Sequence, residues 1–295
     1  MTEDIAAKGW QAPDVYLRAI GASTGGAAPE GPLDVAEAAL AFAALDCPEV
    51  DPAEYRAHLE TLAEDMRQLA RLEDLSTDDA DAILAVRVDM LRNVLSTRHG
   101  YRGDQSTYDD LQNANLIRVI DRRRGLPVAL SILYIHAARA LGWQIEGVNF
   151  PGHFMIRLRV GNRAVILDPF DQGAPRDILD LREKLKAMAG EKAELRPDQS
   201  AAVSDRDILL RLQNNLKLRL VQEGELQRAV AVVERMLWIA PDQAALWREA
   251  GLIHHRLGHL TAARQALQRC LGFESSPAQR HQAARLLQEI ERVLQ

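Results

Sequence analysis

The stretch from Gly125 to Phe170 constrains the fold of this chain more than any other. Its first part, Pro127 to Leu141, repeats apolar residues at helical spacing, and Gly142 follows as a typical helix stop. Its second part reads as a β-hairpin with Gly161-Asn162 as the two-residue turn, because glycine adopts the positive φ that tight hairpins need. We therefore expect a buried helix followed by two antiparallel strands.

The predicted strands, residues 154–160 and 163–167, determine which side chains face each other. A two-residue loop places His153 opposite Phe170, with Asp168 two positions back on the same face. Such diagonal neighbours lie about 7–8 Å apart at Cα, which side chains can bridge. A hydrogen bond from Asp168 would fix the imidazole tautomer and leave the other nitrogen free as a base. The alternative is that both residues only cap and end the strands.

The helix that begins at Pro127 has no nucleophile at its start. Thiol enzymes often place a cysteine at a helix N-terminus, which stabilises the thiolate. Here the residues at that point are Leu126, Pro127 and Val128, all of them inert. Ser131 lies one turn further in, and we expect it to be an ordinary helix serine. The two cysteines, Cys47 and Cys270, lie in other helical segments and are expected to be packed residues.

Three segments of this region, residues 122–127, 147–154 and 167–170, together resemble the bacterial SirB-type proteins, a branch of the transglutaminase-like superfamily. The resemblance implies an α+β, papain-like core with N-terminal helices, usually followed by tetratricopeptide (TPR) helices. It also implies that His153 and Asp168 match the His and Asp of the superfamily's Cys-His-Asp triad, while the Cys position is vacant.

The upstream segment also fits the family pattern, with departures at Asp104, Leu111 and Ala114. If this segment folds over the cleft, Tyr108, Asp110 and Asn113 become candidate binding residues. Arg122, Arg123 and Arg124 form a short basic cluster directly before the predicted helix. We name Arg123 and Arg124 as candidates for contact with an anionic group or a partner's carboxylate, the alternative being a solvated face.

The composition predicts four parts along the chain. Residues 1–32 are rich in Gly, Ala and polar residues and are expected to be a flexible arm. Residues 33–175 form the transglutaminase-like domain, whose N-terminal helices are expected at about 34–45, 52–71 and 77–98. Residues 176–204 are expected to be a linker helix and loop, and residues 205–295 a set of TPR-like helical repeats.

The repeats are visible as a period of 34 residues. Glu223-Gly224-Glu225-Leu226 recurs as Leu257-Gly258-His259-Leu260, and Ala229 recurs as Ala263. This period, with Gly at the turn and Ala in the second helix, is the TPR signature. Because TPR grooves commonly hold peptides, a protein or peptide partner is expected here. His254, His255 and His259 lack a further ligand to complete a metal set, so no metal is predicted.

Composition excludes several classes of function. The formal net charge is −6, and no basic run is long enough for a nucleic-acid footprint. The sequence has no apolar segment long enough for a membrane span and opens without a signal-peptide pattern, so a cytoplasmic location is the expectation. No cofactor is predicted, and the sequence does not specify the oligomeric state.

Two functions follow as hypotheses. The first is a protein-interaction or regulatory module, a pseudoenzyme that retains the His153–Asp168 pair. The second is an amide hydrolase or acyl transferase in which His153 acts as a base oriented by Asp168. In the second case, backbone amides at the start of the Pro127 helix would stabilise an oxyanion.

Overall fold

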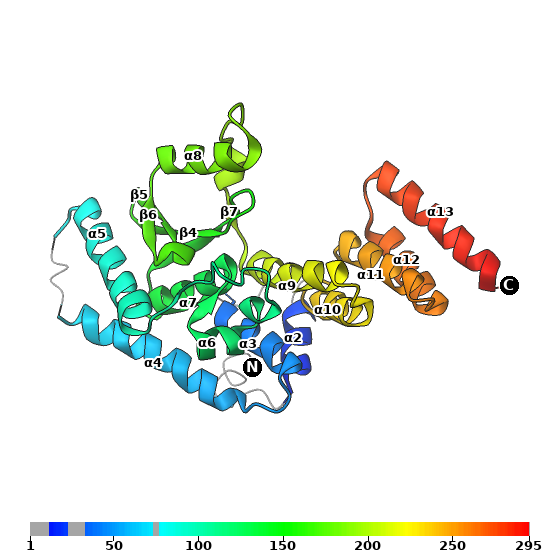
Figure 1. Ribbon diagram of the computed structural model, residues 1–295, viewed down its shortest axis with the longest axis horizontal. Helices are drawn as coiled ribbons and strands as arrows, with labels where there is room; N and C mark the ends of the chain where they lie inside the picture. Colours follow the sequence, from blue (N-terminus) through cyan, green and yellow to red (C-terminus); the bar gives the residue numbers. More distant parts are fainter. Residues whose placement is uncertain (1–11, 23–32, 73–76, 295) are drawn as a thin grey trace. The chain divides into compact units, whose positions relative to one another are not determined.

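The computed structural model describes residues 12–22, 33–72 and 77–294 (Figure 1). The chain divides into two compact units, one made of residues 31–212 and the other of residues 1–30 together with 213–295. We refer to them as the sheet unit and the repeat unit. The boundary falls within helix α9 (Asp205–Gln222), eight residues later than the predicted start of the repeats, so the first turns of α9 belong to the sheet unit.

The sheet unit contains six α-helices before α9 among its described residues. They are α3 (Val35–Asp46), α4 (Pro52–Ala70), α5 (Ala80–Leu91), α6 (Leu116–Arg122), α7 (Pro127–Arg139) and α8 (Ile178–Ala189). The shorter helical segments are the π-helix η1 (Arg92–Arg98) and the 3-10 turns η2 (Leu111–Ala114), η3 (Pro169–Asp171) and η4 (Pro197–Ser200). The strands are β1 (Arg102–Gly103), β2 (Arg124–Gly125), β3 (Gln144–Val148), β4 (Met155–Val160), β5 (Arg163–Asp168), β6 (Ala174–Arg176) and β7 (Ala202–Val203).

The hairpin forms in the predicted register. In β4 and β5, Val160 pairs with Arg163 and Ile156 with Leu167, and Gly161 has a φ of 54° at the turn. The hairpin is the centre of a five-stranded antiparallel sheet with the order β6-β5-β4-β3-β7. The three strands that flank it, β3, β6 and β7, have no counterpart among the predicted elements. A separate parallel pair joins β1 to β2.

Helices cover the sheet on opposite faces (Figure 1). Helix α7 contacts β3 and β4 and is buried along most of its length. It begins at Pro127, whose missing N–H costs nothing at the first helical position. Helix α8 covers the other face, where Leu181 and Leu185 pack against Val148, Phe150 and Met155.

The linker helix predicted within residues 176–204 is present as α8, but α8 and β7 were not expected to pack onto the sheet. Helix α8 starts with a capping box between Asp177 and Asp180 and buries Leu181 and Leu185. Strand β7 extends the sheet by pairing with Gly147 and Val148. The packing of α8 could not be predicted from its sequence, because most of the helix is polar and only two of its twelve residues are buried.

Aspartates fix the starts of the predicted N-terminal helices. The side chains of Asp34, Asp51 and Asp79 accept hydrogen bonds from the first backbone amides of α3, α4 and α5. The helix expected over 77–98 starts at Ala80 and continues from Arg92 as the π-helix η1. Such π-helical segments are frequent at functional sites.

In the repeat unit, the 34-residue period is confirmed. Its helices are α2 (Pro13–Ala22), the later part of α9, α10 (Leu226–Ile239), α11 (Ala244–Arg256), α12 (Leu260–Phe273) and α13 (Pro277–Leu294). Helices α10 and α12 begin 34 residues apart and both run for 14 residues. The glycines before them have φ values of 80° and 75°, and Ala229 and Ala263 are fully buried.

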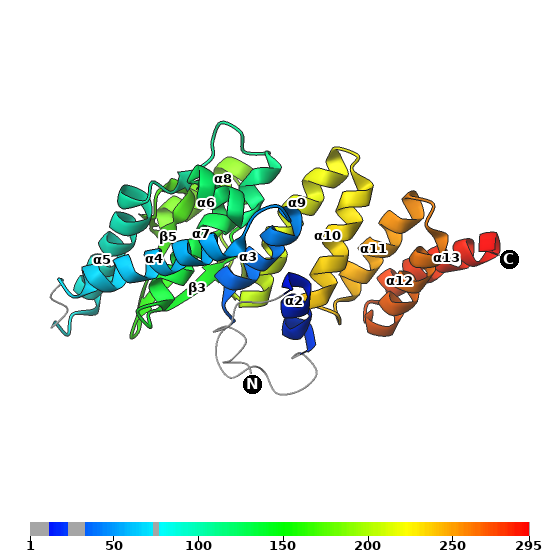
Figure 2. The same cartoon turned by 90° about the horizontal axis from the view of Figure 1, so that it is seen from below.

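Helix α2 lies inside the region that was expected to be a flexible arm. Residues 13–22 are helical and pack along α10, as Figure 2 also shows. Leu17 is fully buried, and the guanidinium of Arg18 lies 4.2 Å from the ring centroid of Trp238. The expectation is thus wrong for this segment, because its single buried face needs a partner helix that its composition does not reveal. The rest of the arm lies outside the described residues.

No helix in the described part of the chain combines the length and the apolar character needed to cross a membrane.

Candidate functional site

His153 and Asp168 meet at the end of the hairpin. The imidazole Nε2 lies 2.8 Å from Oδ1 of Asp168. Both side chains are buried, His153 at 8% exposure and Asp168 at 1%. In the neutral imidazole, with the carboxylate as acceptor, Nε2 donates and Nδ1 is the nitrogen without a proton. No described residue forms a hydrogen bond with that Nδ1. The imidazole therefore has the orientation expected of a general base.

Asp168 accepts three hydrogen bonds and forms one further ion-pair contact. Besides His153, its carboxylate accepts from the backbone N–H of Phe170 at 3.2 Å and from Nζ of Lys184 at 3.3 Å, and Nη2 of Arg176 lies 3.8 Å away. Burial alone would raise the pKa of Asp168, but the hydrogen bond and charge of His153, together with Lys184, lower it below the ordinary value. The carboxylate is therefore ionised and shared between an imidazole and two cations.

An aromatic pair covers the imidazole. The ring of Phe170 meets His153 edge to face at 5.9 Å between centroids, and Tyr108 meets Phe170 in the same manner at 5.8 Å. Gly103 of β1 lies under Phe170, since a Cβ at this position would come within 2.5 Å of the ring. Tyr108, at 39% exposure, is the outermost residue of this series.

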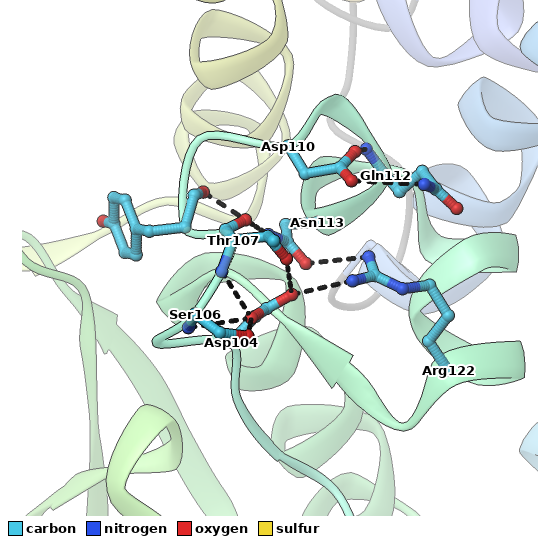
Figure 3. A network of polar contacts seen from close by, with 8 residues as sticks. Asp104, Ser106, Thr107, Asp110, Gln112, Asn113 and Arg122 are labelled. Carbon is cyan, nitrogen blue, oxygen red and sulfur yellow. Dashed lines mark hydrogen bonds and ion pairs between the residues drawn. The ribbon is translucent and has the colours of Figure 1, made fainter.

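A network around Asp104 sets the course of the loop that carries Tyr108 (Figure 3). The buried carboxylate of Asp104 accepts from the backbone and hydroxyl groups of Ser106 and Thr107 and from Nη2 of Arg122. Burial would raise the pKa of Asp104, but these hydrogen bonds lower it far below the usual range. The departure at Asp104 is thus compensated by an ion pair.

The candidate binding residues separate into two groups. Asn113 bridges the network, donating from Nδ2 to the carbonyl of Thr107 at 2.6 Å and accepting from Arg122 at 3.0 Å. Asp110 caps η2 through the amide of Gln112. These two residues shape the loop, and Tyr108 is the candidate that reaches the His153 corner.

Arg123 takes part in a different cluster. It adopts a left-handed φ of 55°, and Nη1 lies 2.6 Å from both the hydroxyl of Tyr101 and Nε2 of His58. Burial, and then the charge of Arg123, lower the pKa of His58 to about 4. Arg124 is half-buried in β2, with no hydrogen bond or ion pair from its side chain to the described residues.

The start of α7 carries no reactive group. Leu126 and Val128 are buried, and the hydroxyl of Ser131 donates to the carbonyl of Pro127 at 2.8 Å. Cys47 is buried beside Asn115, with Sγ 3.6 Å from Nδ2, and Cys270 is buried in the repeat unit. Burial raises the pKa of both thiols, which disfavours the thiolate.

Sequence reasoning missed Lys184 and Arg176. Both bring positive charge to Asp168, from α8 and β6 respectively. Neither element was expected to pack against the hairpin, so no sequence signal pointed to these cations. Among the described residues, no group of three or more His, Cys, Asp or Glu side chains is arranged to hold a metal ion.

Comparison with known proteins gives two family matches. The model of the transglutaminase-like superfamily matches residues 53–214, and a tetratricopeptide repeat model matches residues 216–290.

Whole-length relatives are bacterial. A UPF0162 protein of Xylella fastidiosa is 31% identical, over 81% of this chain and 83% of its own length. A UPF0162 protein of Pseudomonas aeruginosa is 29% identical, over 86% of this chain and 90% of its own length. The likeness to the human F-box only protein 21 is local, at 37% identity over 28% of this chain and 13% of that protein.

Proposed function

Since this chain belongs to the transglutaminase-like superfamily and continues into tetratricopeptide repeats, we propose that it is a non-thiol member acting as a regulatory protein-interaction module. In this proposal the corner of His153, Phe170 and Tyr108 receives part of a partner, and the repeat helices hold a protein or peptide segment. The His153–Asp168 pair is retained as a rigid, charged floor of that corner.

The observation that carries the proposal is the absence of a nucleophile beside the oriented imidazole. A Cys-His-Asp triad needs the thiolate as the attacking group. Both cysteines of the sequence are buried among other residues, and the start of α7 is apolar. The one serine near that point donates its hydroxyl proton to a helix carbonyl. Within the described part of the chain, neither the two cysteines nor the start of α7 therefore offers the base a side-chain nucleophile to activate.

The repeat unit supports the interaction role. Its helices match the repeat pattern over residues 216–290, and such repeats commonly bind peptides. Leu252 of α11 is 44% exposed and is a candidate contact, whereas Trp238 and Trp247 are engaged with Arg18 and with the carbonyl of Pro241. A cytoplasmic location, and partners that are neither membranes nor nucleic acids, form part of the proposal.

An acyl-transfer assay tests this function. The full chain is incubated with a glutaminyl peptide and, separately, with a small thioester, each with a primary amine or water as acceptor. Wild type and His153→Ala, each with its fold verified by circular dichroism, are compared by mass spectrometry. We expect no product and no covalent adduct from either protein. Turnover by wild type that is lost in the folded variant would overturn the proposal.

That contrary outcome defines the second candidate, an amide hydrolase or acyl transferase. The specific observation in its favour is the 2.8 Å bond from His153 to an ionised Asp168, which orients Nδ1 as a base. The attacking group would then be water or a nucleophile carried by the substrate itself. In that case product forms without an acyl-enzyme adduct, and Asp168→Asn reduces the rate.

A further inference from the structure

Two arginines lie side by side on the short parallel pair β1–β2. Arg102 is the register partner of Arg124, and Gly103 is the partner of Gly125. Successive residues of a strand face opposite sides, and register partners share a side. Gly103 faces the ring of Phe170 and Gly125 faces Val119, so both glycines are on the inner side. The two arginines therefore share the outer side, on strands about 4.8 Å apart.

Neither guanidinium is balanced within the structure. Among the described residues, neither the exposed side chain of Arg102 nor the half-buried side chain of Arg124 forms an ion pair or hydrogen bond. Like charges on paired strand positions destabilise a sheet. The arrangement thus carries an electrostatic cost that no described carboxylate of this chain removes.

The two arginines that precede Arg124 in the sequence have partners of their own. Arg122 is neutralised by the buried Asp104 at 2.7 Å. Arg123 bonds to the hydroxyl of Tyr101 and to His58, and no described carboxylate lies within ion-pair distance of it. Arg102 and Arg124 are therefore two positive charges without an ion-pair partner among the described residues, in a chain whose formal net charge is −6.

We propose that the juxtaposed side chains of Arg102 and Arg124 are a docking site for carboxylate side chains in an acidic segment of a partner protein. A guanidinium presents a planar set of donors that matches a carboxylate in a bidentate manner. Two guanidiniums one strand spacing apart suit one shared carboxylate or two neighbouring acidic residues. The proposal rests on the interaction function above and names the chemistry of the partner.

Charge and extent favour an acidic protein segment over nucleic acid. Nucleic-acid binding depends on several phosphate contacts along an extended basic surface. Here Arg118, Arg122 and Arg98 each form an ion pair with a carboxylate. The basic patch that remains is therefore narrow. A short acidic peptide can bind the two guanidiniums. A long nucleic acid would in addition be repelled by the net negative charge of this protein.

A titration of the full chain tests the site. The probe is a capped hexaglutamate peptide, with hexaglutamine as the neutral control and inorganic phosphate as a second anion, all at low ionic strength. The guanidinium signals of Arg102 and Arg124 are followed by NMR in protein labelled with ¹⁵N-arginine. The variants are Arg102→Gln and Arg124→Gln. The matched control is Arg71→Gln, because Arg71 at the end of α4 is exposed and forms no ion pair with the described residues.

We expect hexaglutamate to shift both signals, and each variant to weaken binding by roughly fivefold to tenfold relative to wild type and Arg71→Gln. Hexaglutamine is expected to cause no shift. The proposal is overturned if Arg71→Gln weakens binding as much as Arg124→Gln does. It is also overturned if phosphate shifts the two signals and hexaglutamate does not.

A stability measurement guards against a structural explanation. Relief of like-charge repulsion is expected to leave the melting temperature of Arg124→Gln equal to or above that of wild type. A clear decrease would mean that Arg124 holds the fold and would overturn the assignment. The two proposals fail in different experiments: loss of this site leaves the non-thiol proposal in place, whereas acyl transfer that depends on His153 refutes the non-thiol proposal.

Discussion

Two histidines of the sheet unit, the buried His153 and the half-buried His58, lie in opposite electrostatic surroundings. His153 faces the ionised carboxylate of Asp168, which also holds Lys184. His58 faces the guanidinium of Arg123 and has the hydroxyl of Tyr101 beside it at 2.7 Å. In the first arrangement a carboxylate orients an imidazole, and in the second burial, together with a neighbouring cation, keeps an imidazole neutral. The comparison teaches that a buried histidine is a candidate base only where its partner is an acceptor.

The largest effect is expected from removal of the carboxylate. Asp168→Leu leaves Lys184 and Arg176 without a shared partner in a partly buried site and removes the acceptor of His153. We expect a loss of about 3 to 5 kcal/mol in the free energy of unfolding, measured by urea denaturation. The matched control is Asp171→Leu, since Asp171 is exposed and Arg176 is its only ion-pair partner among the described residues. A cost for Asp168→Leu as small as that of the control would contradict the shared-carboxylate description.

Acid should destabilise the two corners in different pH windows. The pKa of His58 is about 4 in the folded protein and 6.5 in the unfolded chain. Between these pH values the unfolded chain therefore binds a proton at His58 that the folded protein does not bind. Stability from this group is complete above pH 6.5 and decreases by about 2 kcal/mol as the pH falls to 4. Asp168, whose pKa is lowered, loses its contribution only as the pH falls below the unfolded value of 3.8.

Denaturation curves at a series of pH values check this order. His58→Phe is expected to flatten the dependence between pH 6.5 and 4 and to leave the acidic decrease below that range. His136→Phe is the control, because His136 forms a hydrogen bond with the carbonyl of Leu59 and, within the part of the chain that the structure describes, with no charged group. If His58→Phe left the slope unchanged, the neutral-imidazole description would be wrong.

The aromatic cover of His153 depends on a glycine. Gly103→Ala places a Cβ within 2.5 Å of Phe170, so either the ring or β1 must move. We expect a cost of about 2 kcal/mol and altered ring-current shifts at His153 in NMR spectra. Gly272→Ala in α12 is the control, because no heavy atom outside its local chain lies within 4 Å of that Cβ. It should be neutral or slightly stabilising, since alanine favours helix more than glycine does.

The smallest effect is expected from Lys184. Lys184→Met removes one of the charges that lower the pKa of Asp168, so that pKa should rise and the acidic loss of stability should begin at higher pH. Because the side chain is 33% exposed, we expect a cost of only about 1 kcal/mol at neutral pH. Lys186→Met, which affects an exposed contact to Glu191, should change neither quantity. Equal acid profiles for the two variants would exclude Lys184 from the site.

Sequence patterns predicted the local parts of this structure well. The hairpin register, and with it the approach of His153 to Asp168, follows from a two-residue turn and the alternation of strand residues. The 34-residue period placed α10 and α12. The pattern also predicted Ser131 as a helix serine, which its bond to Pro127 confirms.

Partners that come from distant segments could not be predicted. Lys184 reaches Asp168 because α8 buries two leucines against the sheet, and its charged surface gave no sign of that packing. Arg122, Arg123 and Arg124 are adjacent in sequence, yet Asp104, His58 and the strand pair β1–β2 give each of them a different environment. Helix α2 was missed because its buried face consists of little more than Leu17 and Gly21.

The most direct test of the contrast between the two corners is a ¹⁵N NMR titration of the histidine side chains in the full chain. We expect His153, when neutral, to carry its proton on Nε2, facing Asp168. In the same spectra we expect His58 to take up a proton only near pH 4. A proton on Nδ1 of His153, or titration of His58 near pH 6.5, would contradict these expectations.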